Sequence, residues 1–215
     1  MSSDVYPAAG EHRADRSRKP PTEGRVRRLR FTRDMYHEMA KAGILRQDRR
    51  YQLLDGIIFV MPAMSHPHWL ALNSLNALLI KRLPDGWCST CQSPVVTDEF
   101  GEPEPDLAIL RGALRDYSVK PTAADTAIVI EVSDTTAGFD RRRKLVAYAE
   151  AGIPEYWLIN LVDRAVEVRT DPRPRDGNTA GAYASLRTYR GDEQVPLRLD
   201  GQTIAEFPVT ELMPV

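Results

Sequence analysis

Apolar and polar residues recur with two different periods along this chain, and these periods predict its helices and strands. Apolar positions three and four residues apart predict three helices: Arg33 to about Ala42, Ser65 to about Leu83, and Phe139 to Ala151. Shorter apolar runs predict strands at Tyr51 to Leu54, Ile57 to Met61, Trp87 to about Thr97, around Asp106, around Glu131, and at Tyr156 to Asn160. Beyond these, the runs AVEVRT, YASLRTYR and VPLRL alternate, as antiparallel strands with one wet face do.

Local signals fix several connections between these elements. Thr32 is a suitable N-cap for the first helix, and Gly43 a suitable stop. The pair Asp55-Gly56 tolerates a tight two-residue turn, so the strands on either side should form a hairpin. The strand around Glu131, the helix after it and the strand from Tyr156 form a βαβ unit. We therefore expect an α/β (α+β) fold with a mixed sheet.

Length and charge set the domain organisation. The chain has 215 residues, which suits a single domain over residues 31–215. Residues 1–30 are rich in Arg and Pro and poor in core-forming side chains, which predicts a disordered basic arm. The net charge of −1 excludes binding to nucleic acid by bulk electrostatics, so any polyanion contact should be local. No apolar run is long enough for a membrane span or a signal peptide, and we expect a cytoplasmic protein.

Two carboxylates stand inside apolar strand-like runs. Asp106 lies in PEPDLAIL and Glu131 in IVIEVS. A buried carboxylate needs a partner, because an unpaired charge in an apolar interior costs several kcal/mol. One reading pairs each acid with an Arg or a helix N-terminus. The other brings the two acids together around a hard divalent cation, Mg²⁺ or Mn²⁺, and the helix after Glu131 favours this second reading.

That helix places three polar residues four positions apart. Asp140, Lys144 and Tyr148 share one helical face, and a lysine there could reach back toward the preceding strand. Negative charge accumulates on a phosphodiester as it is attacked, and a nearby ammonium group stabilises that charge. Two carboxylates and a lysine are therefore sufficient for metal-dependent phosphodiester hydrolysis.

The segments YQLLDGIIFVMP, SHPH, PEPDLAIL, IVIEVSDTT and FDRRRKLVAYAEAGIPEYWLIN resemble the Uma-two family of bacterial proteins described as restriction endonucleases. The resemblance runs from about Phe31 to Val168. It implies the PD-(D/E)XK nuclease fold, a central mixed sheet flanked by helices. It also implies that Asp106 and Glu131 hold the metal and that Lys144 is the catalytic lysine, displaced onto the following helix.

The chain departs from the family pattern at two positions. Ser133 stands two residues after Glu131, where nucleases of this type carry a lysine. Gln52 stands where similar proteins carry a glutamate, so one expected carboxylate becomes a neutral carbonyl oxygen, which should weaken Mg²⁺ binding. His68 matches a histidine of similar proteins and is a candidate for the rim of the site, although a histidine in a first helical turn is also a common surface residue.

The leading hypothesis is a Mg²⁺-dependent endonuclease that hydrolyses DNA. The alternative hypothesis is a nuclease-like scaffold that binds nucleic acid or a protein partner without cutting. A third hypothesis is a hydrolase of another phosphate ester. Nucleases that cut both strands often act as dimers, so a homodimer is one expectation. Cys88 and Cys91 form a CxxC pair, but residues three apart on a strand point to opposite faces, which argues against a zinc site.

Overall fold

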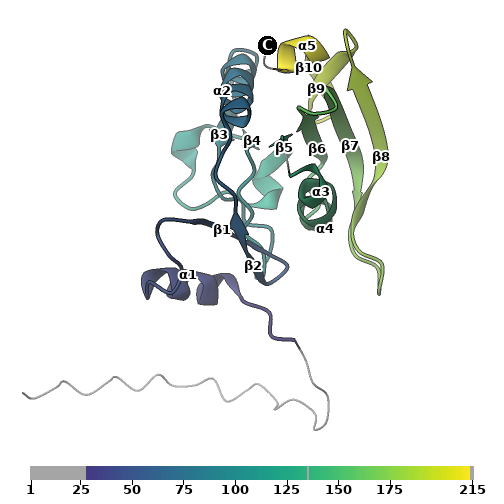
Figure 1. Cartoon of the computed structure of the whole chain (residues 1–215). Coiled ribbons are helices and arrows are strands. Elements are labelled where there is room, and N and C mark those ends of the chain that lie inside the picture. Colours follow the sequence, from purple (N-terminus) through teal and green to yellow (C-terminus); the bar gives the residue numbers. More distant parts are fainter. Residues whose placement is uncertain (1–27, 135, 214–215) are drawn as a thin grey trace, which may run out of the picture.

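The computed structural model describes residues 28–134 and 136–213, and its centre is a six-stranded mixed sheet (Figure 1). The strand order is β3-β4-β5-β6-β7-β8, in which β5 and β6 are parallel and every other neighbouring pair is antiparallel. The strands are β3 (Trp87–Cys91), β4 (Leu107–Arg111), β5 (Thr126–Ser133), β6 (Glu155–Asn160), β7 (Ala165–Arg173) and β8 (Ala182–Arg190). The mixed sheet confirms the predicted fold class, whereas the predicted basic arm over residues 1–30 lies almost wholly outside the described residues.

The two faces of the sheet are covered by different elements. One face, which includes Ile130 and Trp157, packs against α2 (His66–Ile80), the hairpin of β9 (Gln194–Leu199) and β10 (Gln202–Pro208), and α5 (Val209–Leu212). The other face, which includes Val129 and Leu158, packs against α4 (Leu145–Glu150). Because β5 is buried on both faces, all eight of its residues are buried, Glu131 among them.

A smaller hairpin and the first helix lie below the six-stranded sheet in the view of Figure 1. The hairpin joins β1 (Arg50–Leu54) to β2 (Ile57–Met61) through Asp55 and Gly56, both with positive φ, as the sequence predicts. Helix α1 (Arg33–Lys41) begins after Thr32, whose side chain accepts a hydrogen bond from the backbone of Met35. The predicted hairpin and helix start are therefore confirmed.

Three predicted boundaries are wrong. The strand predicted from Trp87 to about Thr97 ends at Cys91, because Gln92 adopts a positive φ of 45° and leaves the ladder. The helix predicted to reach Leu83 ends at Ile80. The single helix predicted from Phe139 to Ala151 consists of α3 (Ala137–Phe139), a π turn (Asp140–Lys144, labelled η3) and α4. Two short 3₁₀ turns, η1 (Leu114–Asp116) and η2 (Ala123–Asp125), complete the fold.

Glu155 makes folding stability depend on pH. Burial raises its pKa to about 7, although the indole of Trp157 donates to it at 2.5 Å. The folded state therefore binds this proton more firmly than the unfolded state, and the stability that it contributes is lost as the pH rises from about 4.5 to 7. We expect Glu155→Gln to stabilise the protein by up to about 3 kcal/mol at pH 8 and much less at pH 5, in urea unfolding.

The matched control is Glu206→Gln, which changes an exposed carboxylate on β10. It should shift the unfolding midpoint equally little at both pH values. A gain for Glu155→Gln that is the same at pH 5 and pH 8 would show that the Glu155 carboxyl does not titrate as described.

Candidate active site

Adjacent strands bring Asp106 and Glu131 to one end of the sheet. Asp106 directly precedes Leu107, the first residue of β4, and Leu107 pairs with Ile130 of β5. The backbone N–H of Val132 donates to Oδ2 of Asp106 at 2.8 Å, which ties the aspartate to the strand that carries Glu131. Strand β4 thus begins one residue after Asp106, so the aspartate directly precedes the strand rather than lying inside it as predicted.

The carboxylate of Glu131 accepts hydrogen bonds from two residues of the following helix. Lys144 Nζ donates to Oε2 at 2.6 Å, and the Tyr148 hydroxyl donates to Oε1 at 2.7 Å. All three side chains are almost fully buried, with 0 to 3 % of their surface exposed. The helix therefore does bring Lys144 and Tyr148 back to the strand. Glu131 therefore already has an internal cation as its partner, and this cation is a lysine rather than the Arg or helix N-terminus of the competing interpretation.

Burial dominates the electrostatics of this cluster. Burial raises the pKa of Glu131 above its usual value, whereas the charge of Lys144 opposes the shift and favours the ionised carboxylate that accepts both hydrogen bonds. For Lys144, burial lowers the pKa, but Glu131 and Asp106 raise it, and the net direction is upward. Lys144 is therefore a charged ammonium group at neutral pH, held among several carboxyl groups.

The π turn determines how the helix presents its polar face. The backbone N–H of Leu145 bonds to the carbonyl oxygen of Asp140, five residues back, and the Tyr156 hydroxyl donates to the same oxygen at 3.3 Å. One extra residue is thereby accommodated between Asp140 and Leu145, and both Asp140 and Lys144 are buried at its ends. Single π turns are frequent at functional sites.

Asp106 is held from several sides. His68, in the first turn of α2, lies with Nε2 3.1 Å from Oδ1, and the Gln92 amide donates to the same oxygen at 3.4 Å. Burial raises the pKa of Asp106, but the His68 hydrogen bond and the charge of Lys144 outweigh burial, so the net shift is downward and the aspartate is ionised at neutral pH. The structure thus places His68 in the lining of the pocket, beside Asp106, and its role in the site stays a prediction.

Gln52 supplies an oxygen atom without a partner. Its side chain is 1 % exposed, and its Nε2 donates to the carbonyl oxygen of Glu104 at 3.2 Å. Within the described part of the chain, its Oε1 is buried without a hydrogen-bond partner. An unsatisfied buried carbonyl oxygen in the same pocket as two carboxylates suits a hard cation, so the residues at this site fit Mg²⁺ or Mn²⁺. Asp106 and Glu131 would be the charged ligands and Gln52 a neutral one.

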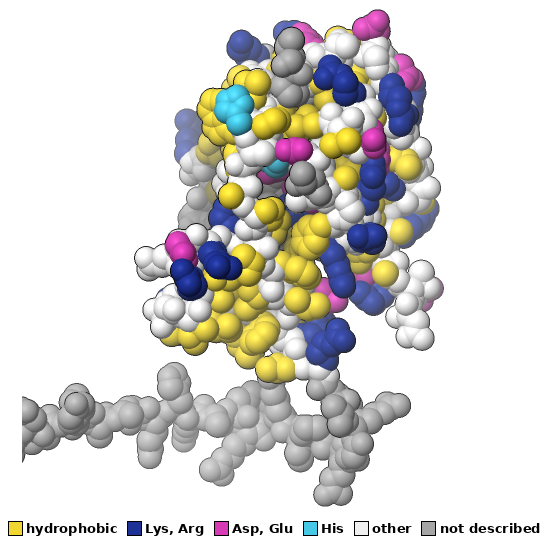
Figure 2. Space-filling model, in the orientation of Figure 1, with side chains coloured by type: hydrophobic (Ala, Val, Ile, Leu, Met, Phe, Trp, Pro, Cys, Tyr) yellow, Lys and Arg dark blue, Asp and Glu magenta, His cyan; other side chains and the backbone are white. Residues whose placement is uncertain are grey.

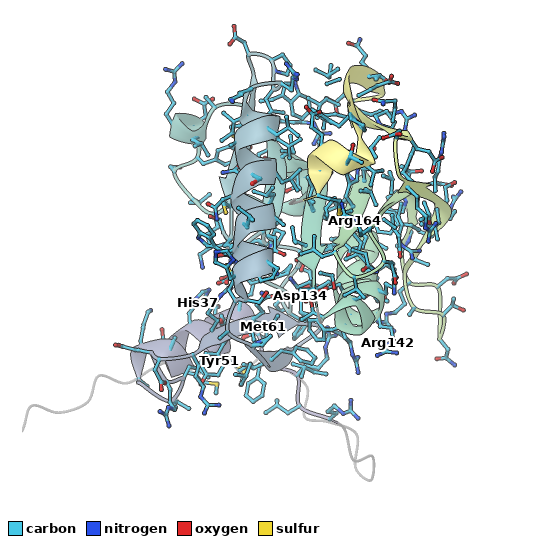
Figure 3. The ribbon with its side chains drawn as sticks, turned by 45° about the horizontal axis from the view of Figure 1, so that its top comes forward. His37, Tyr51, Met61, Asp134, Arg142 and Arg164 are labelled. Atoms are coloured by element: carbon cyan, nitrogen blue, oxygen red, sulfur yellow. The ribbon has the colours of Figure 1, made fainter. Side chains whose placement is uncertain are left out.

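These side chains line one pocket of about 70 Å³. Its wall combines the β1–β2 hairpin, the start of α2, the ends of β4 and β5, and the π turn. It includes Gln52, Met61, Ser65, His68, Asp106, Glu131, Asp134, Asp140 and Lys144. Ser65, the N-cap of α2, donates to Asp134 at 2.5 Å, and Figure 3 shows Asp134 beside the N-terminal end of α2. The volume accommodates a cation with a few water molecules.

Asp140 lines the pocket, and within the described part of the chain it forms no ion pair. It is 2 % exposed and accepts a hydrogen bond from the Thr136 hydroxyl at 2.7 Å. Burial raises the pKa of its carboxyl, while Lys144 lowers it. The predicted face of Asp140, Lys144 and Tyr148 is therefore directed toward the site.

The sequence does not indicate several groups that form this site. The backbone carbonyl of Glu104 accepts from both Gln52 and Lys144, the latter at 3.4 Å, and Asp134 reaches the pocket from the end of β5. A backbone acceptor leaves no residue-type signal, whereas Asp134 in VSDTT was available as a polar residue after a buried strand. Cys88 and Cys91 lie on β3 as free thiols, and neither lines the pocket.

Among residues 28–134 and 136–213, no group of three or more His, Cys, Asp or Glu side chains is arranged to hold a metal ion. Two acids, Asp106 and Glu131, and the Gln52 amide would be the ligands, and Asp134 and Asp140 also line the pocket. In the same ranges, no helix is both long and apolar enough to span a bilayer.

Comparisons with known proteins identify a family and a fold. The model of the Uma2 family, described as "Putative restriction endonuclease", matches residues 33–205. A solved structure described as a putative nuclease belonging to DUF820, from Anabaena variabilis ATCC 29413, aligns with a TM-score of 0.59 at 12 % sequence identity. The alignment covers 85 % of this chain and 97 % of that one, so the two share a fold. No curated protein matches the sequence.

Proposed function

The chain belongs to the Uma2 family of restriction-endonuclease-like proteins, and from that membership we propose that it hydrolyses DNA phosphodiester bonds with a divalent cation held by Asp106 and Glu131. The observation that carries the proposal is the convergence of these two acids, from neighbouring strands, on a pocket that Lys144 also lines. Gln52 supports the proposal, because its buried carbonyl oxygen needs a partner that a cation would supply.

Each side chain has a distinct role in the proposed reaction. When bound, Mg²⁺ supplies Lewis-acid stabilisation of the scissile phosphate and makes a water molecule more acidic. Lys144 neutralises negative charge that develops on the phosphate. Tyr148 fixes the carboxylate of Glu131, and His68 fixes that of Asp106, so neither acid needs to reorganise during the reaction.

Purified protein should nick or cut plasmid DNA in Mg²⁺ or Mn²⁺ and should lose this activity in EDTA. The assay should include RNA and a panel of phosphate esters, because a hydrolase of another phosphate ester would also use this site. Cleavage that is undiminished in EDTA would contradict the metal-dependent proposal.

One observation favours a second function. Both oxygens of Glu131 already accept hydrogen bonds from Lys144 and Tyr148, which satisfies the buried carboxylate without metal. A nuclease-like scaffold that binds nucleic acid or a protein partner without cutting fits this arrangement. Calorimetric titration separates the two functions, because a scaffold should bind neither Mg²⁺ nor Mn²⁺ at millimolar concentration. The homodimer and the cytoplasmic location remain predictions.

Replacing Gln52 by glutamate should strengthen metal binding. Gln52→Glu adds a formal charge beside Asp106 and Glu131, and the number of charged ligands sets cation affinity. We expect the Kd for Mg²⁺ to fall about tenfold in isothermal titration calorimetry. The glutamate cannot donate to the Glu104 carbonyl, so metal-free Gln52→Glu protein should unfold at a slightly lower temperature.

The matched control for added charge is Gln202→Glu on β10, which is exposed and distant from the pocket. It should leave the Kd unchanged. An unchanged Kd in Gln52→Glu, with the fold intact, would remove Gln52 from the set of metal ligands.

A further inference from the structure

We infer that the mouth of this pocket takes an unpaired nucleic-acid strand, with a base stacked on Trp69 and the backbone along Arg142 and Arg164. The inference rests on the proposed nuclease function and names the form of nucleic acid that the site accepts. It follows from a difference between the two sides of the mouth. Hydrophobic side chains gather over α2 and the β1–β2 hairpin, whereas Lys and Arg gather over α3–α4 and β7 (Figure 2).

The α2 side of the mouth is uncharged and carries an exposed aromatic ring. Trp69 immediately follows His68, which lines the pocket, and 50 % of its surface is exposed. The His66 ring lies 5.8 Å from it, centroid to centroid, at an interplanar angle of 32°. From His66 to Ile80 the helix contains no Lys, Arg, Asp or Glu, so roughly 22 Å of its surface offers no charge to a phosphate.

The opposite side carries arginines that form no ion pair in the described ranges, whereas Arg50 of β1, which also lines the pocket, is paired with Glu104 at 3.4 Å. Arg142 lies in the π turn between Asp140 and Lys144, both of which line the pocket. Arg142 and Arg164 are exposed, and in the described ranges neither forms an ion pair. Figure 3 shows both on the side of Asp134 away from α2. Two arginines free of carboxylate partners can each contact a phosphate.

This asymmetry fits one strand better than a duplex. A duplex presents phosphates on both sides of a groove and keeps its bases stacked on one another, so an exposed Trp beside the pocket would find no base to stack on. A single strand has one line of phosphates and bases free to stack on an aromatic side chain. A net charge of −1 adds no general attraction for the duplex polyanion.

The test is a fluorescence titration in EDTA, which measures binding without cleavage. The probes are a 20-nucleotide DNA strand, its duplex, and the RNA strand of the same sequence. Of the three Trp residues, Trp157 is fully buried and Trp87 lies under the guanidinium of Arg111, so stacking should quench mainly Trp69. We expect quenching by the single strands and at least tenfold weaker binding of the duplex. The DNA and RNA titrations identify which strand is preferred.

Variants assign the effect to residues. Trp69→Leu should abolish the quenching and weaken strand binding about tenfold, whereas Trp69→Phe should keep most of the affinity. Arg142→Gln should weaken binding and flatten its salt dependence by about one phosphate contact. The controls are Ile80→Ala, an exposed apolar residue at the other end of α2, and Arg115→Gln, an exposed arginine after the far end of β4; neither should change binding.

Equal or tighter binding of the duplex, or strand binding that is unchanged in Trp69→Leu, would overturn the inference. Strand binding with quenching but no cleavage in Mg²⁺ would contradict the proposed function and leave the inference standing. Cleavage of duplex alone, with no strand binding in EDTA, would contradict the inference and leave the proposed function standing.

Discussion

Asp106→Asn should remove Mg²⁺-dependent DNA cleavage while the protein stays folded. Asparagine has the same shape and can still accept the hydrogen bond of the Val132 N–H, but it lacks the negative charge that attracts a cation. Removing a residue that hydrogen-bonds to a metal ligand lowers metal affinity or activity by about 10–100-fold. Removing the charge of the ligand itself should have a larger effect, so we expect kcat/KM to fall by more than about 100-fold. The measurement is nicking of supercoiled plasmid in Mg²⁺, with urea unfolding alongside.

The control is Asp192→Asn, which changes an exposed aspartate in the turn between β8 and β9 and should cleave DNA as the wild type does. Glu131→Gln should be as inactive as Asp106→Asn. If Asp106→Asn folds normally and keeps more than a tenth of the wild-type rate, Asp106 is not a metal ligand in the reaction.

Lys144→Met should cause the largest loss of folding stability of any single change at this site. It leaves Glu131 buried without its cation, and breaking a buried ion pair by removing one partner costs about 3–5 kcal/mol. The Tyr148 hydroxyl still donates to Glu131, but it carries no charge. We expect the free energy of unfolding at pH 7 to fall by this amount in urea, together with loss of cleavage.

Two further variants separate charge from packing. In the double variant Glu131→Gln with Lys144→Met both charges are absent, so most of the lost stability should return. Lys41→Met breaks the pair of Lys41 with Glu38, which has a similar distance of 2.8 Å but is largely exposed, and it should lower the free energy of unfolding far less than Lys144→Met does. A double variant no more stable than Lys144→Met would show that the lysine contributes packing rather than charge.

Local sequence signals account for the elements that were predicted correctly. Asp55-Gly56 and the Thr32 cap act within a few residues, so the sequence alone determines the hairpin and the start of α1. The βαβ unit around β5 and β6 follows equally from two apolar runs and the helix between them.

Other features depend on contacts between distant residues. The π turn is one such feature, because the apolar periodicity of the helix does not indicate it. Tyr156 of β6 donates to the Asp140 carbonyl from outside the helix. The early end of β3 depends on Gln92, whose backbone N–H bonds to Asp106. Strand β10 was not predicted, because its residues become a strand by pairing with β9 and covering the sheet.

Some residues of the candidate site can likewise be predicted from local sequence, whereas their contacts depend on how distant residues pack. The sequence indicates Asp106 and Glu131 because carboxylates stand out in apolar runs, and Lys144 because it lies one helical turn from Asp140. It gives no sign that Lys144 and Tyr148 would both bind Glu131, which only the packing of α4 on β5 determines. The Glu104 carbonyl is likewise a product of chain geometry.

A crystal soaked in Mn²⁺ tests the central claim, that Asp106 and Glu131 hold a divalent cation, most directly. We expect an anomalous peak in the pocket, about 2.0–2.3 Å from an oxygen of each acid and within ligand distance of Gln52 Oε1. No peak at millimolar Mn²⁺, with Lys144 still donating to Glu131, would contradict it.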